Sequence, residues 1–241
     1  MALRRHGGGR YHVVGCDVLP DVRTKALALG AVDRAEATWQ DVVAGVDLII
    51  LATPPAVTVD LVSPVLTATS TSDRLPIVTD VCSIKRPILR AAGGDVRFVG
   101  AHPMAGNEIG GIETADANLF MGAPWGLVPT LERSACTTML EAGQPMPERL
   151  LEAIAVTGGK PPVIMSAEAH DAIVAMTSHI PTRTSMRLLQ MSAAQQARDA
   201  QTLTLTAGGY RDMTRVGKSP MSMWGDIFEL NADWIIQLSG V

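Results

Sequence analysis

The chain has 241 residues, of which 47% are hydrophobic and 18% charged, a balance typical of a globular protein and not of a disordered or fibrous one. Its formal net charge of −4 argues against binding to nucleic acid, which depends on clustered lysine and arginine. The three cysteines form no CxxC pair, so we expect no disulfide framework, no metal site and a reducing, cytoplasmic setting. No apolar run reaches the roughly 18 residues of a membrane span, and the N-terminus lacks the apolar segment of a signal peptide.

Strand-like and helix-like segments alternate along the first two thirds of the chain. Short, mostly apolar runs predict strands at residues 10–17, 46–52, 75–81, 96–100, 125–129 and 160–165. Helical stretches lie between several of them, notably at 21–29, after Pro54-Pro55 and at 148–157. Strands that alternate with helices imply βαβ units, so we expect an α/β fold with a Rossmann-like, doubly wound parallel sheet.

From residue 166 onward the pattern changes to helical periodicity with no strand-like run. Helices, the first of them interrupted by Pro181, are expected at 168–189, around 193–205 and at 224–238. We therefore predict a domain boundary near residue 166. Residues 1–166 would form a dinucleotide-binding domain, and residues 167–241 a small all-helical domain.

Asp17 closes the first predicted strand. A carboxylate at this point can accept both ribose hydroxyls of a dinucleotide and would repel a 2′-phosphate, which favours NAD over NADP. The glycine-rich loop that cradles the pyrophosphate lies about 20 residues before such an acidic residue. We therefore expect that loop to lie before Met1, with residues 1–7 as the end of the first helix and the domain incomplete at its N-terminus. Alternatively, Asp17 is an ordinary turn residue.

Ser83 and His102 each follow a predicted strand, where open α/β sheets place groups that contact a ligand. Their segments read D-V-C-S-I-K and G-A-H-P-M-A-G, and the later segments S-H-I-P and T-R-V-G-K-S begin at Ser178 and Thr214. With Trp224 at matching spacing, these segments resemble, in order, the D-x-x-S-x-K, G-x-H-P-M-A-G, S-H-x-P and T-R-x-x-K-S-x-x-x-x-W segments of the prephenate/arogenate dehydrogenases. Residues 119–125 and the pair His170-Asp171 also look like this family, so the resemblance covers nearly the whole chain.

The resemblance implies NAD-dependent oxidation and decarboxylation of prephenate to 4-hydroxyphenylpyruvate in tyrosine biosynthesis, by a homodimer that associates through its helical domain. His102 matches the catalytic histidine that removes the proton of the ring hydroxyl, and histidine titrates near neutral pH. Ser83 matches a serine near the hydroxyl and the nicotinamide, where it orients the reacting groups. The loop Thr53-Pro54-Pro55 matches the family loop that lies along the dinucleotide.

The remaining matched residues concern the substrate. Arg215 matches an arginine that binds a substrate carboxylate, for which a planar bidentate donor is well suited. Glu108 matches an acidic residue near the pocket mouth that can pair with this arginine, and Ser178 and His179 lie at matched positions on a helix. Thr182 departs from the family, whose members often have a second histidine there that contacts substrate. Threonine cannot carry charge, which leaves arogenate or a related cyclohexadienyl ring open as the substrate.

Several of these residues also have an ordinary structural explanation, which for His102 is a surface turn residue. Ser83 could cap the following helix, Arg215 and Glu108 could be surface charges, and His179 could be a core residue. Two other functions stay open for the chain. One is a truncated, catalytically silent homologue that serves in association or ligand sensing. The other is a different Rossmann-type reductase, such as a 3-hydroxyacid dehydrogenase, which would not explain the G-A-H-P-M-A-G segment.

Overall fold

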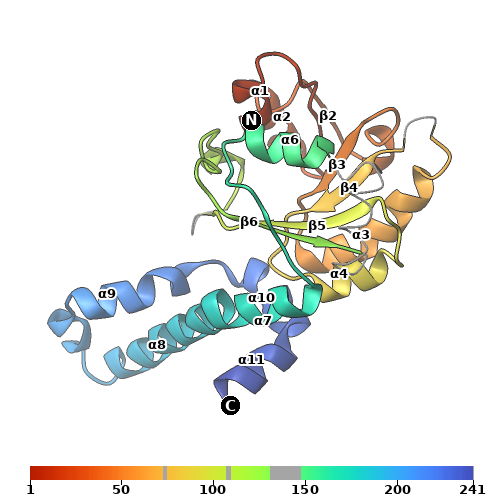
Figure 1. Cartoon of the computed structure of the whole chain (residues 1–241). Helices are drawn as coiled ribbons and strands as arrows, with labels where there is room; N and C mark the ends of the chain where they lie inside the picture. The colour runs from red at the N-terminus through yellow and green to blue at the C-terminus, as the bar shows by residue number, and fades with distance from the viewer. Residues whose placement is uncertain (73–74, 107–109, 131–147, 241) are drawn as a thin grey trace. The chain divides into compact units, whose positions relative to one another are not determined.

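The computed structural model describes residues 1–72, 75–106, 110–130 and 148–240 of the chain (Figure 1). The chain divides into two compact units, Met1–His170 and Asp171–Val241, and the division falls inside helix α7 (Ala167–Val174). Within the described ranges, no helix is both long and apolar enough to cross a membrane.

A five-stranded sheet forms the centre of the first unit. Its strands, in the spatial order β3-β4-β5-β6-β7, are β3 (Leu48–Leu51), β4 (Ile77–Asp80), β5 (Phe98–Pro103), β6 (Trp125–Pro129) and β7 (Val163–Ile164). Each lies within or overlaps one of the predicted apolar runs, so these strand predictions are confirmed. The α/β class and the Rossmann-like arrangement of parallel neighbours β3, β4 and β5 are confirmed with them.

The sheet is mixed, because β5 and β6 pair in antiparallel fashion while the other three pairings are parallel. The predicted parallel sheet therefore contains one antiparallel pairing. Parallel neighbours need a crossover connection, usually an α-helix. The described part of the connection from β5 to β6 contains only the short 3-10 helix η2 (Ile112–Thr114). β6 therefore runs back beside β5 in the opposite direction.

Helices pack on the two faces of this sheet. Residues of β5 alternate: Val99 and Ala101 share a core cluster with Leu150 and Ile154 of α6 (Glu148–Val156). The intervening Gly100 faces the other way, since a Cβ on it would meet side chains of residues 85 and 89. Helices α3 (Pro55–Ala68) and α4 (Arg86–Ala91) follow β3 and β4 and contact β4 and β5 respectively. The period of two along a strand therefore places the next even residue of β5, His102, on the α4 face.

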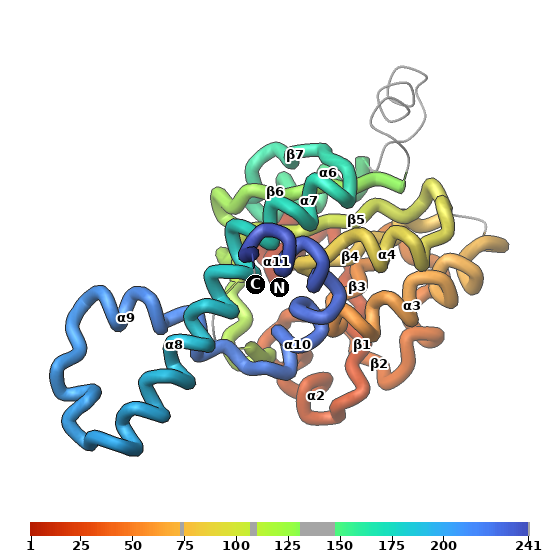
Figure 2. The backbone as a smooth tube through the Cα atoms, turned by 90° about the horizontal axis from the view of Figure 1, so that it is seen from below, coloured from red at the N-terminus to blue at the C-terminus, as the bar shows by residue number. Residues whose placement is uncertain are grey.

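The N-terminal segment forms a separate, smaller sheet. β1 (Val14–Cys16) and β2 (Arg34–Glu36) are parallel and joined by α2 (Pro20–Ala28), and Figure 2 shows the three elements together. Helix α1 (Ala2–His6) precedes them, and the 3-10 helix η1 (Trp39–Asp41) follows. The predicted strand at 10–17 and the helices at 1–7 and 21–29 are thus confirmed. β2 was not predicted, because its Arg-Ala-Glu sequence has no apolar run.

All secondary structure in the described residues of the second unit is helical. After α7 it contains the π-helix η3 (Ala175–His179), α8 (Ile180–Gln196), η4 (Thr202–Leu205), α9 (Gly208–Arg215), η5 (Val216–Lys218), α10 (Met221–Leu230) and α11 (Ala232–Ser239). The predicted helix at 168–189 is confirmed, with Pro181 in the first turn of α8. The stretch at 193–205 is helical only at its ends, and the one at 224–238 is broken at Asn231 into α10 and α11. Helix α9 was not predicted.

Candidate active site

Three adjacent parallel strands end at one edge of the sheet, and each carries a predicted site residue there. Thr53 follows β3, Ser83 follows β4, and His102 is the next-to-last residue of β5. The carboxyl ends of parallel strands form the ligand-binding edge of an open α/β sheet, so the fold gathers these three side chains where a ligand is expected. Pro54 is the N-cap of α3 and Pro55 its first residue, where the missing N–H of proline has no helical partner to lose.

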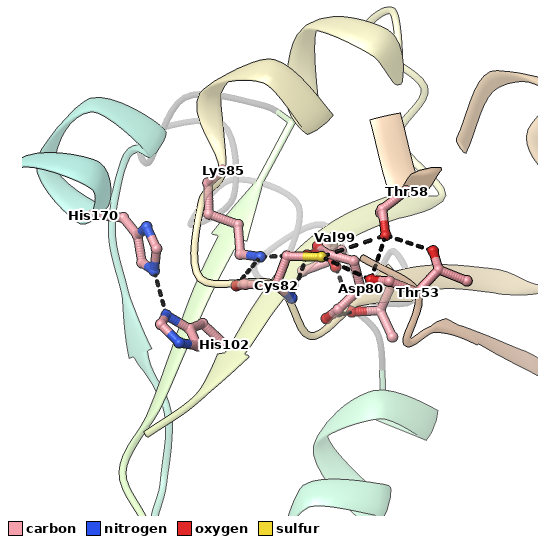
Figure 3. A network of polar contacts seen from close by, with 9 residues as sticks. Thr53, Thr58, Asp80, Cys82, Lys85, Val99, His102 and His170 are labelled. Atoms are coloured by element: carbon pink, nitrogen blue, oxygen red, sulfur yellow. Dashed lines mark hydrogen bonds and ion pairs between the residues drawn. The ribbon is translucent and has the colours of Figure 1, made fainter. Parts of the chain in front are cut away.

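His102 contacts a second histidine. Its Nδ1 lies 2.9 Å from Nε2 of His170, and the two rings meet edge to face with centroids 5.1 Å apart (Figure 3). His170 is fully buried and His102 is partly buried. In a hydrogen bond between neutral imidazoles one ring donates and the other accepts. If Nδ1 of His102 donates, Nε2 of His102 becomes its basic nitrogen.

A buried ion pair lies beneath the turn that carries Ser83. Asp80 ends β4, and both Asp80 and Lys85 are completely buried, with Lys85 Nζ donating to Oδ2 of Asp80. Lys85 Nζ also donates to the carbonyl oxygen of Cys82 at 2.8 Å, and the Cys82 N–H donates to Asp80 Oδ2 at 2.8 Å (Figure 3). Gly100 on β5 makes room for the lysine, because a Cβ there would lie 2.8 Å from Lys85 Cδ.

The thiol of Cys82 connects this turn to the loop after β3. Its Sγ lies 3.4 Å from Oγ1 of Thr58 and 3.6 Å from the carbonyl oxygen of Thr53, and the two threonine hydroxyls are 2.8 Å apart. Burial, reinforced by the negative charge of Asp80, raises the pKa of the Cys82 thiol to about 12. The thiol is therefore protonated at neutral pH, and it serves as a hydrogen-bonding link and not as a nucleophile.

Asp17 lies directly after β1, in the two-stranded sheet. Its Oδ1 accepts the N–H of Leu19 at 2.8 Å, and its carbonyl oxygen accepts a hydrogen bond from Arg23 at 2.6 Å. The first contact is that of an ordinary turn aspartate. A carboxylate has a second oxygen that can accept a ribose hydroxyl, so the turn contact and a cofactor role are compatible.

Three predicted substrate residues lie along one helical run of the second unit. Ser178 and His179 end the π-helix η3, and Thr182 lies in the first turn of α8. His179 is fully buried, and its Nδ1 is 3.1 Å from Nδ2 of Asn231, which also donates to the carbonyl oxygen of Asp171 at 2.9 Å. Because an amide nitrogen only donates, Nδ1 of His179 accepts, and a neutral His179 carries its proton on Nε2.

Arg215 is the last residue of α9 and is exposed. The short helix η5 that follows it packs tightly on α8 at Gly217. A Cβ on Gly217 would lie 2.5 Å from Oγ of Ser185 and 2.7 Å from the main-chain nitrogen of Met186. This close approach, possible only for glycine, fixes the segment that presents Arg215.

Several polar partners could not be identified as such from the sequence. His170 was noted only within a family-like dipeptide, and Asp80 and Lys85 only as letters of a motif. Nothing in the sequence drew attention to Asn231. Glu108, the predicted acidic residue, lies outside the described residues.

Comparison with known proteins identifies the family. A family model described as prephenate dehydrogenase, nucleotide-binding domain, matches residues 1–141, and one described as prephenate dehydrogenase, dimerization domain, matches residues 166–239. Prephenate dehydrogenase of Bacillus subtilis (strain 168) is 27% identical over 243 residues, which cover 98% of this chain. The chain spans 61% of the length of that relative.

Two solved structures are similar over almost the entire chain. Prephenate dehydrogenase from Aquifex aeolicus, in complex with hydroxyphenyl propionate and NAD+, superposes with a TM-score of 0.79 and 26% identity, covering 99% of this chain and 80% of that one. Synechocystis arogenate dehydrogenase superposes with a TM-score of 0.69 and 27% identity, covering 98% of this chain and 80% of that one. Since the first family model alone matches more than half of the residues, the chain belongs to the prephenate dehydrogenase family.

Proposed function

We propose that this chain catalyses the NAD-dependent oxidation and decarboxylation of prephenate to 4-hydroxyphenylpyruvate in tyrosine biosynthesis. The observation that carries the proposal is the hydrogen bond between His102 and His170 at the ligand-binding edge of the sheet. A histidine held by one ring nitrogen is suited to act as a base through the other. Membership of the prephenate dehydrogenase family supports the same activity.

The residues at the strand ends fit a bound NAD. Asp17 offers a carboxylate oxygen for the ribose hydroxyls, and Thr53 and Pro54 form a short turn at the carboxyl end of β3 that enters α3 at Pro55. A dinucleotide can lie along this turn. Ser83 follows the neighbouring strand and offers its hydroxyl to the nicotinamide end. When bound, NAD supplies the acceptor for the hydride that leaves C4 of the substrate, and loss of carbon dioxide from C1 then makes the ring aromatic.

His102 is the proposed base. Its Nδ1 proton is donated to Nε2 of His170, so Nε2 of His102 accepts the proton of the C4 hydroxyl. The hydrogen bond to His170 holds the ring in this tautomer and gives the positive charge that develops on His102 a nearby acceptor. Ser83 orients the hydroxyl and the nicotinamide, which converts the reaction into an intramolecular one.

The helical part is assigned to substrate binding and assembly. Arg215 would pair with a substrate carboxylate, with Ser178, His179 and Thr182 as further contacts and Glu108 as a partner of the arginine. We assign residues 1–166 to the cofactor domain and residues 167–241 to a domain that also forms a homodimer. The match of residues 166–239 to a dimerization domain supports the dimer.

Arogenate is the second candidate substrate. The chain is similar to an arogenate dehydrogenase, and it has Thr182 where many family members have a histidine. A buried threonine hydroxyl can hydrogen-bond to a substrate group but cannot offer a positive charge to it.

The test is turnover by the purified chain, followed as NADH absorbance with prephenate and with arogenate in parallel. We expect turnover with prephenate, and a loss of about 10²- to 10⁴-fold in kcat for His102→Asn, the range of a general base. Faster turnover of arogenate would replace prephenate by the second candidate. No turnover with either, in a sample shown to be folded, would overturn the activity and favour a catalytically silent homologue.

A further inference from the structure

The two peptide groups that precede the Cα of Ser83 are both held by one buried ion pair. Asp80 Oδ2 accepts the N–H of the Val81–Cys82 peptide at 2.8 Å. Lys85 Nζ donates to the oxygen of the Cys82–Ser83 peptide at 2.8 Å. The ion pair between Asp80 and Lys85 joins these two contacts into one closed network.

Holding both peptide groups fixes Ser83 itself. A peptide group is planar, so gripping its N–H or its oxygen sets the orientation of the whole plane. The second plane includes the main-chain nitrogen of Ser83, and its orientation determines where the Cα and Cβ of Ser83 lie. The turn is closed on its far side as well, because the carbonyl oxygen of Lys85 accepts the N–H of Leu89 in α4.

The ion pair is a costly way to stabilise a fold. Both side chains are completely buried, and Asp80 Oδ1 is also buried and accepts no hydrogen bond from any described residue. Removing two charges from water is unfavourable, and a buried pair is often no more stabilising than apolar residues of the same size. Neighbouring β5 also lacks a side chain at Gly100, where the lysine passes. Apolar residues could not hold the two peptide groups of the turn, because they form no side-chain hydrogen bonds.

We propose that Asp80 and Lys85 are positioning residues for Ser83, which act on catalysis by fixing the turn and not by touching substrate or cofactor. This inference rests on the proposed function, in which Ser83 orients the reacting groups. A misplacement of about 1 Å can cost about 10²-fold in rate when a group acts by orientation. Loss of the pair should therefore lower kcat and leave the apparent affinity for substrate less affected.

The variant of choice removes both charges together, because a lone buried charge would unfold the protein. Asp80→Asn/Lys85→Met keeps a carbonyl acceptor for the Cys82 N–H and an unbranched chain beside Gly100, but it loses the ammonium that grips the Cys82 oxygen. The matched control is Asp95→Asn/Arg97→Met, which removes a partly buried ion pair whose arginine binds the carbonyl oxygen of Leu66.

We would measure kcat, KM, thermal unfolding and amide hydrogen exchange over residues 81–85 for both double variants, each with and without Ser83→Ala. In the Ser83 background, Asp80→Asn/Lys85→Met is expected to lower kcat by about 10- to 100-fold. It should also speed exchange of the Cys82 amide, whose N–H Asp80 accepts. In the Ser83→Ala background it should lower kcat less than about 2-fold further, because effects that pass through one residue do not add. The control should change thermal stability but not kcat.

The outcomes separate this inference from the proposed function. A folded double variant with unchanged kcat, or a kcat loss that persists in full in the Ser83→Ala background, would overturn the positioning role while leaving the enzyme activity intact. No turnover by the folded unmodified chain would instead overturn the proposed function, and the catalytic role of the ion pair with it.

Discussion

At the scale of single residues, His102 and His170 determine each other's protonation. The distance of 2.9 Å between Nδ1 and Nε2 allows one proton between them, so the tautomer of one ring decides that of the other. An ionised carboxylate partner could always accept the Nδ1 proton of His102. His170 can accept it on Nε2 only when the proton of His170 is on Nδ1. The base therefore depends on the tautomer of a fully buried neighbour.

Replacing His170 tests this dependence. His170→Ala removes the acceptor of the Nδ1 proton, so we expect kcat to fall by about 10- to 100-fold. Loss of the general base itself should cost more, about 10²- to 10⁴-fold. Steady-state kinetics across pH would measure it, with the exposed His12→Ala as the control that leaves kcat unchanged. An unaltered kcat in a folded His170→Ala protein would show that His102 does not need its partner.

The Cys82 thiol makes a second prediction, for stability against pH. Its pKa is about 12 in the folded chain and about 9 when exposed. Between these values the unfolded state releases a proton that the folded state keeps. The contribution of the thiol is thus complete below about pH 9 and declines by about 1.4 kcal/mol per pH unit above it.

Urea unfolding at about pH 8 and about pH 10.5 would measure this decline. We expect a smaller loss of stability between the two pH values for Cys82→Ala than for the unmodified chain, since the variant has no thiol to titrate. Cys16→Ala, at an exposed position, should keep most of the decline. Equal slopes for all three proteins would show that Cys82 is not shielded from water.

The positions of two proposed site residues at strand ends could be predicted, and the reason is local. Ser83 and His102 each come at the end of an apolar run, so their place at a strand end follows from their neighbours in sequence. His170 is separated from His102 by 68 residues, and their contact depends on how β5 and α7 are placed. Asp80 and Lys85 are only five residues apart, but a sequence pattern does not show that both charged side chains are buried.

At the scale of elements, the contact of η5 with α8 places the substrate arginine of the proposed mechanism. The helices approach so closely at Gly217 that a side chain would overlap main-chain atoms of α8, which cannot rotate away. Arg215, two residues earlier, is thereby held at a set distance along α8.

Gly217→Ala tests this packing. The added methyl would meet Ser185 and Met186, so we expect a loss of about 1–3 kcal/mol in stability from overpacking. If Arg215 binds the substrate, its displacement should also raise KM for prephenate more than KM for NAD. Gly225→Ala in α10 is the control, because apart from its own stretch of helix no atom of the described residues lies within 4 Å of the added carbon. Alanine should stabilise that helix by about 0.5–1 kcal/mol. A Gly217→Ala protein as stable as this control would contradict the close approach.

Elements could be predicted from sequence where one physical cause dominated. Apolar runs identified the strands of the large sheet, because burial on both faces leaves a continuous signal. The antiparallel pairing of β6 was not visible, since the direction of a strand is set by its connection and not by its residues. The break at Asn231 was not visible either, because its hydrogen bonds reach His179 and Asp171, more than 50 residues away.

At the scale of the whole molecule, the helical unit exposes many apolar side chains. Leu205 is 89% exposed, and Met191, Met213 and Met221 are each more than half exposed. These side chains are available for burial against a second copy of the chain. This supports the proposal that the helical domain forms the homodimer.

Sedimentation equilibrium would measure the assembly. We expect a mass of twice 25.5 kDa, and a shift toward the monomer when Met191→Asp places a charge on the helical unit. Val18→Asp, at an exposed apolar residue of the first unit, should leave the mass unchanged. A mass of 25.5 kDa at all concentrations would rule out the dimer.

The π-helix at Ala175–His179 sets the phase of the helix that follows it in this chain. A π turn closes over one residue more than an α turn, so everything after it is rotated by about 100° relative to an unbroken α-helix. Deleting Thr177 would restore the α-helical phase, and it would turn Thr182 and the rest of α8 by about 100° relative to residues 171–174. One residue of the π turn therefore decides which side chains before and after it share a face.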